Sequence, residues 1–450
     1  MSEIYSLLAS VVLLALGTRF EPIRGWWLST LRERYLVSFW FPFLIITGWP
    51  AVTGDAYLEG QDLGWQRIAR ILLFAGFATS FLAMLISRRP LAIPRLRSIR
   101  VFAVYSVVCA LSTFWSPEPV QTLWKAFELF ALLLIITELY QSKTNSGCRA
   151  IQIAGTLMFL SFSLCVTALV GAVVAPQIAW AYQDAYGESG LRGLTGVAPM
   201  INANMLGQLG ATVALVGALR IAVASGGHYR GDFVVLGVGI VTLALAYART
   251  SMIAMVILSF FLLVTLRRSR WIFTALILTL VAVIIFPGEL MTYFARGQTE
   301  EQFVGLTGRT YRWEAALAGF WEHPWLGHGF FVGHKYVLSG GGHYYATTDS
   351  TYVETLVNLG VTGFVLVVFF AVQASAEAWQ SLWRLRLACG ELRNAALVFC
   401  VFVGFIVFRS FTASSFQVLH YNLVFILVVL TGVALLRRTL RTADRAGLRY

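Results

Sequence analysis

Two arginines stand three residues apart at the start of "TGRTYRWEAALAGFWE", a segment whose apolar spacing predicts an amphipathic helix. The free amides and the dipole of a helix N-terminus favour anions, and guanidinium groups bind phosphate oxygens through a planar fork. Arg309 and Arg312 therefore indicate a phosphate site. A second interpretation of the same residues is an ordinary solvated helix start, with Arg312 paired to Glu314 or Glu322.

An acid and a histidine that can take a proton from a hydroxyl group follow in "GGHYYATTDSTYVETLVNLGVTGF". Asp349 stands directly before an apolar run in which Tyr352 and Leu356 lie one turn apart, so we expect it at the head of a helix. Asp349 is the candidate general base, with His343 as its substitute or partner. The alternative for Asp349 is a helix N-cap.

A third arginine, Arg249, lies where two apolar runs meet in "LALAYARTSMIAMVILSF". A guanidinium buried in hydrocarbon is costly, so we expect Arg249 at the membrane surface, in a tight turn between two helices. There it either snorkels to lipid phosphate and caps helix carbonyls, or supplies a fixed positive charge to a site. Arg192, in the segment "GLRGLTG", is a further candidate for binding phosphate or sugar.

Membrane helices must position these residues, because 58% of the 450 residues are hydrophobic and only 12% are charged. Apolar runs of about 16 to 25 residues recur, and period-2 alternation is absent. We therefore predict an all-α polytopic membrane protein with about thirteen transmembrane helices (about 12 to 14), with residues 1–450 forming one integral membrane domain. The expected spans have their cores at 4–18, 35–53, 68–87, 101–115, 124–141, 151–180, 203–224, 233–248, 251–266, 271–287, 352–378, 395–412 and 421–436.

The loops on one side of these spans carry most of the Lys and Arg residues, for example in "SRRPLAIPRLRSIR", "WRLRLACGELR" and "LRRTLRTADRAGLRY". The positive-inside rule assigns this side to the cytoplasm. The net charge of +12 is thereby explained by topology, and no nucleic-acid partner is expected. Residues 288–351 then form one large loop on the outer side, and loops of this length usually carry function.

The histidines of this loop also raise the question of a metal. Their spacings match no compact metal-binding pattern, and no cysteine accompanies them, so we expect neither a metal site nor a cofactor. These histidines are His323, His328, His334 and His343.

Taken together, the order of these features resembles the superfamily of O-antigen ligases and Wzy-type polysaccharide polymerases of bacterial inner membranes. The resemblance covers residues from about 110 to about 370. Its motifs are "WSPEP", "GLRGLTGVAPMINANMLG", "ART" with Arg249, "TGRTYRW", "HPWLGHGF" and "DSTYVETLVNLGVTG". Ligases carry a histidine where this chain has Asp349 followed by Ser350, and this departure favours a polymerase.

The resemblance implies a glycan donor carried on undecaprenyl pyrophosphate and a glycan or lipid-linked acceptor, joined on the periplasmic side of the inner membrane. Arg249 and Arg309 would hold the departing pyrophosphate, Asp349 or His343 would accept the hydroxyl proton, and Arg192, Arg312 and Tyr352 would bind substrate. The reaction would be inverting and independent of metal. A flippase and a chain-length regulator are the implied protein partners, and the lipid bilayer is the surroundings.

Two alternatives remain at this point. A ligase would transfer the finished glycan to lipid A core or to another acceptor. A polysaccharide flippase or exporter would also have about a dozen spans, but a transporter should place charged residues deep inside them. We place acids within spans only at Glu128 and Glu138, and the candidate residues instead gather on one face, which favours an enzyme.

Overall fold

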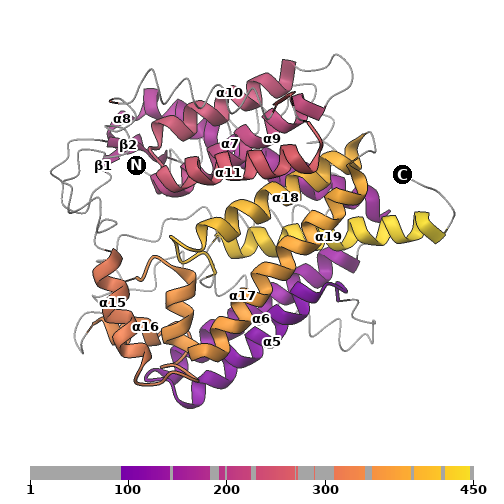
Figure 1. Cartoon of the computed structure of the whole chain (residues 1–450). Coiled ribbons are helices and arrows are strands. Elements are labelled where there is room, and N and C mark those ends of the chain that lie inside the picture. The colour runs from indigo at the N-terminus through magenta and orange to yellow at the C-terminus, as the bar shows by residue number, and fades with distance from the viewer. Residues whose placement is uncertain are drawn as a thin grey trace.

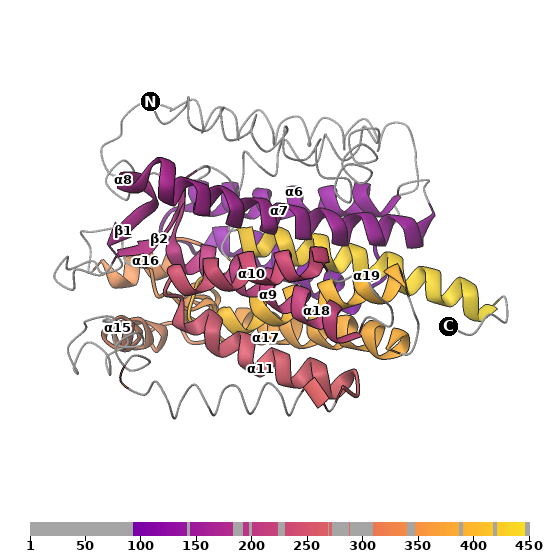
Figure 2. The ribbon, with the colours of Figure 1, turned by 90° about the horizontal axis from the view of Figure 1, so that it is seen from above.

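The computed structural model describes residues 93–141, 145–182, 192–197, 200–223, 230–268, 270–271, 288, 309–339, 347–386, 390–416 and 421–445. Most of them lie in helices that run roughly along one direction (Figures 1 and 2). The helices of the bundle are α5 (Arg97–Leu111), α6 (Pro119–Gln141), α7 (Ser146–Val174), α9 (Ala203–Val223), α10 (Arg230–Leu245), α11 (Arg249–Thr265), α17 (Thr351–Leu385), α18 (Glu391–Arg409) and α19 (Tyr421–Arg445).

Within the described residues, seven helices are long and apolar enough to cross a membrane. They are α5 with the 3-10 turn η2 (Ser112–Phe114), α6, α7, α9, α17, α18 and α19, whereas α10 and α11 are shorter, at 16 and 17 residues. The prediction of a mainly helical, polytopic membrane protein is therefore confirmed. The expected spans at 4–18, 35–53 and 68–87, and nearly all of 271–287, lie outside the described residues, so the total of about thirteen stays a prediction.

Helix α9 lies at the centre of this part of the bundle, because nearly all of its residues are buried. Glycines on both helices let α9 approach α10 closely. A Cβ atom on Gly239 would lie 2.4 Å from the backbone nitrogen of Ala214, and one on Gly210 would lie 2.9 Å from that of Leu243. Small residues are the usual means of bringing membrane helices this close, and they fix α9 against α10 here.

The remaining elements gather at one end of the bundle in both views, and the C-terminal end of α19 lies at the opposite end (Figures 1 and 2). We call the first of these the α15 end. Its elements include four short strands, which the all-helical prediction did not include. The strands pair in a connecting segment and do not cross the bundle. The elements are α8 (Pro176–Ala179), β1 (Trp180–Tyr182), β2 (Arg192–Leu194), β3 (Gly196–Val197), β4 (Met200–Ile201), α15 (Arg309–Phe320) and α16 (Gly333–Leu338).

The expectation that acids lie within spans only at Glu128 and Glu138 is wrong. Helix α17 also buries Glu354 and Glu377. Both carboxylates are satisfied locally, since Glu377 accepts a 2.7 Å hydrogen bond from the backbone amide of Arg97, and Glu354 lies beside a histidine described below. Both acids were overlooked because the run around them is long and apolar, and their partners belong to other elements.

Candidate active site

Helix α15 brings Arg309 and Arg312 to one face at its N-terminus. The helix is fixed by its other end, where Ala316 and Phe320 pack against Val357 of α17. On the N-terminal side, the Arg312 guanidinium donates a 3.0 Å hydrogen bond to the carbonyl of Thr347, and the Trp313 indole donates one of 2.7 Å to the carbonyl of Thr348. These contacts tie the segment before α17 to the first turn of α15.

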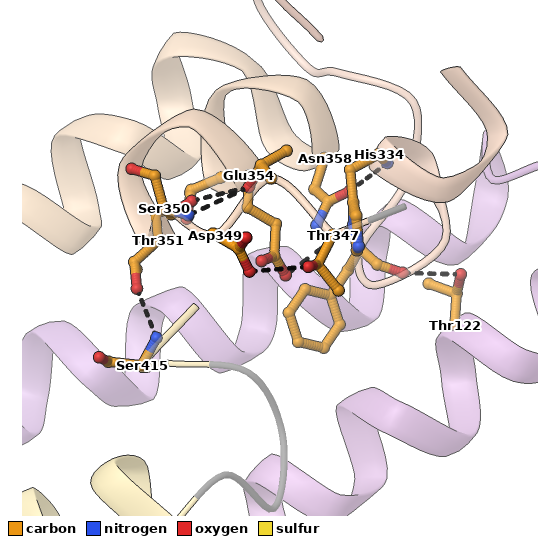
Figure 3. Close-up of polar contacts among 12 residues, drawn as sticks. Thr122, His334, Thr347, Asp349, Ser350, Thr351, Glu354, Asn358 and Ser415 are labelled. Atoms are coloured by element: carbon orange, nitrogen blue, oxygen red, sulfur yellow. Dashed lines mark hydrogen bonds and ion pairs between the residues drawn. The ribbon is translucent and has the colours of Figure 1, made fainter. Parts of the chain in front are cut away.

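Asp349 completes this cluster. One of its carboxylate oxygens lies 2.9 Å from a terminal nitrogen of Arg312 and 3.7 Å from Nε of Arg309. The other accepts a 2.9 Å hydrogen bond from the hydroxyl of Thr347 (Figure 3). The Asp349 side chain is 34% exposed and the two arginine side chains 24% and 29%, so all three can meet a ligand. Arg312 is thus paired with Asp349, and not with Glu314 or Glu322 as the alternative interpretation has it.

Asp349 is not the cap of α17. The helix begins at Thr351 with Ser350 as its N-cap residue, and no side chain makes a capping hydrogen bond. The backbone of Asp349 has φ of 50°, in the left-handed region that Asp tolerates better than most residues. Backbone strain of this kind is common where a side chain is held for a function, and here it accompanies a carboxylate paired with two arginines.

A third guanidinium acts on this cluster, that of Arg409 in the last turn of α18. Burial lowers the pKa of Arg309; the charge of Asp349 raises it, and the charges of Arg312 and Arg409 lower it further. Two arginines paired with one carboxylate, and a third that acts on Arg309, leave an excess of positive charge within this cluster of described residues. The cluster therefore has the electrostatics of an anion site.

Arg409 is held from the centre of the bundle. Its guanidinium donates to the carbonyl of Asn204 and, at 3.0 Å, to the side-chain oxygen of Gln208, both on α9. Gln208 also accepts a 2.9 Å hydrogen bond from the hydroxyl of Tyr421 and donates one of 2.9 Å to Asn422. Sequence reasoning missed Arg409, although an arginine at the outer end of an expected span is the signal that singled out Arg249.

Arg249 lies at the first position of α11, in the tight turn after α10, where the sequence predicts it. The turn is strained at Tyr247, whose φ is 50°. It packs on the same part of α9 that holds Arg409, because Gly207 leaves room for the methyl group of Ala248. Arg249 is thus near the Arg409 network through α9, whereas the ion pairs described for Asp349 are with Arg309 and Arg312.

Other predicted residues are placed less directly. Tyr352 lies in the first turn of α17 with its ring 4.7 Å from that of Phe411, so it takes part in packing. Arg192 belongs to strand β2, which pairs with β1 at the same end, and its side chain lies outside the described part of the chain. His343 also lies outside it. The structure brings Arg309, Arg312 and Asp349 together, and leaves Arg192 and His343 untested.

A second polar centre lies further along α17, around the fully buried His334 of α16. The Nδ1 atom of His334 lies 3.1 Å from the side-chain oxygen of Asn358 and 3.8 Å from the carboxylate of Glu354. The backbone amide of His334 donates to the same Asn358 oxygen, at 2.7 Å. Glu354 lies between this centre and Asp349 (Figure 3). Burial lowers the pKa of His334, against a smaller opposing effect of Glu354, so the ring is neutral at neutral pH.

Glycines fix the loop between α15 and α16 onto α17. Gly327 and Gly329 have φ of 65° and 106°, and Gly360 in α17 has φ of 65°. A Cβ atom on Gly327 would lie 2.4 Å from the backbone of Asn358, and one on Gly360 would lie 2.4 Å from that of Trp325. The motifs "HPWLGHGF" and "LVNLGVTG" are therefore the two halves of one backbone contact.

The motif "WSPEP" meets the same loop. The indole of Trp115 donates a 3.1 Å hydrogen bond to the carbonyl of Leu326, and the hydroxyl of Thr122 donates one of 3.1 Å to the carbonyl of Phe330. An open cavity of about 460 Å³ lies between the two segments. We call it the aromatic cavity, and its polar and aromatic lining includes Trp115, Glu322, His323, Trp325, His328 and Tyr336.

The segment that contains these site residues also matches a known protein family. Residues 234–368 match the O-antigen ligase family. The match runs from α10 to the middle of α17 and includes Arg249, Arg309, Arg312, Asp349 and the His334 centre. It confirms the predicted resemblance to O-antigen ligases and Wzy-type proteins. No curated protein matches the chain.

The match of this segment to the O-antigen ligase family points to a glycosyl-transfer enzyme with lipid-linked glycan and acceptor substrates in a bilayer. Arg409 and Arg192 lie outside the matched residues. Among the residues that the structure describes, no three His, Cys, Asp or Glu side chains form a group that could hold a metal ion.

Proposed function

We propose that this protein is a polysaccharide polymerase, which joins oligosaccharide repeat units carried on undecaprenyl pyrophosphate into O-antigen or exopolysaccharide. The observation that carries the proposal is Asp349, which lies 2.9 Å from Arg312 and 3.7 Å from Arg309 within a segment of the O-antigen ligase family. A carboxylate directly beside fixed cations combines, in one place, a group that accepts a proton and groups that bind phosphate.

The arginines would bind the pyrophosphate of the donor. A departing lipid pyrophosphate gains negative charge in the transition state, and preorganised guanidinium groups stabilise such charge without reorganisation. Arg309 and Arg312 would contact the phosphates directly, while Arg409 adds positive potential from the end of α18. Arg249 would complete the site from the α11 side of α9.

Asp349 would act as the general base once the donor is bound. Without a ligand, its carboxylate is the anion that the arginines hold. A pyrophosphate entering the site competes for the same guanidinium groups, so Arg312 would turn to the phosphate and release Asp349. The freed carboxylate accepts the proton of the acceptor hydroxyl as that oxygen bonds to the anomeric carbon and the bond from this carbon to the pyrophosphate oxygen breaks.

A single displacement of this kind inverts the configuration at the anomeric carbon, because acceptor and leaving group occupy opposite faces. The cations that stabilise the leaving group are supplied by arginine, so the proposed reaction uses no metal. Asp349, or His343 in its place, is the residue to which the proton goes.

The aromatic cavity supports the binding of a sugar chain in the same region. Sugar rings stack on aromatic side chains, and their hydroxyl groups bond to carboxylates and imidazoles. Trp325 is 72% exposed at its rim, and Trp115 is held by its hydrogen bond to Leu326. The cavity lies toward the far end of α15 from Arg309, so glycan bound at the arginines could extend into it.

The orientation of the site follows from charge. The end opposite α15 carries the arginines of α19, and basic ends of membrane helices face the cytoplasm. The α15 end would therefore face the periplasm, in a bacterial inner membrane, where a flippase would deliver the lipid-linked donor. A chain-length regulator is the further partner that this assignment implies.

Ligase activity is the second candidate, because the matching family is that of O-antigen ligases. Deleting the gene and separating the lipid-linked and exported glycans of the host distinguishes the two. We expect single repeat units to accumulate on the lipid carrier, and complementation with the intact gene to restore polymer. Full-length polymer left on its carrier would instead assign the protein as a ligase, and unchanged glycans would contradict both.

A further inference from the structure

Arginines also surround a cavity at the opposite end of the bundle. It has a volume of about 820 Å³ and lies between the chain entering α5, the end of α6 and the last turns of α19. We call it the basic cavity. Its lining includes Arg95, Arg100, Arg437, Arg438, Arg441 and Arg445.

Within the described part of the chain, the charge of the basic cavity is not balanced. Among the residues that the structure describes, no Asp or Glu lines it. Of its arginines, Arg437 lies 3.8 Å from the carboxylate of Glu377, and the other arginines of the lining make no ion pair within the described residues. The nearest acid in sequence, Asp444, lies 3.8 Å from Arg384 instead.

A neighbouring cavity shows what a balanced arrangement looks like. It has about 390 Å³, shares Arg95, Arg437 and Arg441 with the basic cavity, and contains Glu377. Glu377 accepts hydrogen bonds from the start of α5 and pairs with Arg437, so it serves as the resident anion there. The larger cavity has arginines of the same helix and, among the described residues, no such anion, which favours an anion from outside the chain.

The lining also has an apolar part, which narrows the class of ligand. Ile93, Leu96, Tyr140 and Ala434 contribute to it beside the arginines. Ile93 is 56% exposed. Because α6 and α19 are helices long and apolar enough to span a bilayer, the cavity lies where such helices leave the hydrocarbon. A ligand that is anionic at one end and apolar at the other matches both parts of the lining.

We propose that the basic cavity binds the headgroup of an anionic phospholipid, with the phosphate among the arginines of α19 and α5 and the acyl chains against Ile93 and Tyr140. Basic pockets between membrane helices are suited to such headgroups. This site is separate from the α15 end and does not depend on the proposed polymerase activity. It would fix α5, α6 and α19 to the leaflet on that side.

The test uses the intact protein purified in detergent, with retained lipids measured by native mass spectrometry after titration with phosphatidylglycerol or phosphatidylcholine. The wild type should retain phosphatidylglycerol in preference to phosphatidylcholine. The double variant Arg438→Gln/Arg441→Gln should bind phosphatidylglycerol about 10-fold to 30-fold more weakly, because it removes two charges from the site. The matched control is Arg267→Gln/Arg270→Gln, which removes two charges after α11, at the same end of the bundle, and should bind like the wild type.

Three results would overturn the proposal. Equal loss in the control variant would mean that diffuse surface charge, and not the cavity, attracts the lipid. Equal retention of phosphatidylcholine would mean that the headgroup charge is not recognised. Displacement of phosphatidylglycerol by millimolar inorganic pyrophosphate, with no effect on phosphatidylcholine, would mean that the cavity binds a soluble phosphate compound.

Discussion

Two polar centres lie close together on the N-terminal part of α17, and they differ in what surrounds them. At Asp349, a carboxylate and two arginines are partly exposed, and a third arginine adds positive potential. At His334, a fully buried imidazole contacts Asn358 and lies near the buried Glu354. The difference indicates that the histidine of α16 serves packing, while the proposed reactive position is partly exposed and has more cations than carboxylates around it.

The His334 centre joins two elements. The side-chain oxygen of Asn358 accepts a hydrogen bond from the backbone amide of His334 in α16, and the backbone carbonyl of Asn358 accepts one of 2.8 Å from the amide of Gly329. These contacts fix the loop after α15 on α17. They therefore position the helix that carries Arg309 and Arg312, so the buried centre supports the exposed one.

The largest effect is expected from the arginines. Arg309→Ala and Arg249→Ala should each reduce polymer formation about 10²-fold to 10³-fold, because each removes a fixed cation that faces the leaving pyrophosphate. Lysine should restore only part of the activity, since it lacks the planar fork. The measurement is turnover of lipid-linked donor by purified protein with matched expression and insertion. Near-normal turnover of Arg249→Ala would mean that this side chain only reaches to lipid phosphate or caps helix carbonyls.

A smaller effect is expected for Arg409, which acts on the site from α18. Arg409→Gln should lower donor affinity about tenfold, or about 1.4 kcal/mol, because it removes one of the positive charges proposed to act on the pyrophosphate. Its expected signature is a raised KM for the donor with kcat nearly unchanged. Gln208→Glu tests the same charge in a second way. It keeps a hydrogen-bond acceptor for Arg409 but adds a negative charge beside its guanidinium. An unchanged KM for the donor in both variants would show that Arg409 does not contribute to donor binding.

The His334 centre should affect stability more than chemistry. His334→Gln should lower stability by about 1 to 3 kcal/mol, because it leaves buried polar groups without their partner. Burial lowers the pKa of His334 from 6.5, so the unfolded chain binds a proton more readily. Wild-type stability should therefore fall as pH drops below about 6.5, and this part of the pH dependence should be absent in the variant.

Thermal unfolding in detergent at several pH values measures this effect, and Asp349→Asn provides the control from the other centre. Loss of turnover in folded His334→Gln protein at neutral pH, with stability unchanged, would reverse the roles assigned to the two centres.

No effect is expected from a chelator. Turnover by purified protein should be unchanged in excess EDTA, because the proposed cations at the pyrophosphate are guanidinium groups. A loss of activity that a divalent cation restores would show that the arginines are not sufficient.

Much of the bundle could be predicted from sequence, because a helix in a membrane must be long, apolar and internally hydrogen-bonded. Every expected span between 101 and 266 and between 352 and 436 overlaps a helix, and α15 lies where apolar spacing predicts it. The span expected at 151–180 is too long, because α7 ends at Val174 and is followed by α8 and by strand β1. The buried acids Glu354 and Glu377 were missed, since a hydropathy pattern does not contain the partner that makes a buried carboxylate tolerable.

The site was predictable only in part. The types and motif positions of Arg309, Arg312 and Asp349 indicated a phosphate site with a base nearby. Their pairing could not be deduced, because it depends on the left-handed backbone at Asp349 and on hydrogen bonds from α15 to Thr347 and Thr348. The backbone contacts of Gly327 with Asn358 and of Gly360 with Trp325 could not be deduced either, since they join two motifs that look independent in the sequence.

The central claim is that Asp349 takes the proton of the acceptor hydroxyl, and the most direct measurement is the turnover of Asp349→Asn at saturating lipid-linked donor, beside His343→Ala. We expect Asp349→Asn to lose about 10²-fold or more in kcat while still binding the donor, the usual scale for a general base, and His343→Ala to be milder. Normal turnover by Asp349→Asn together with an inactive His343→Ala would contradict the account and would move the assignment toward a ligase.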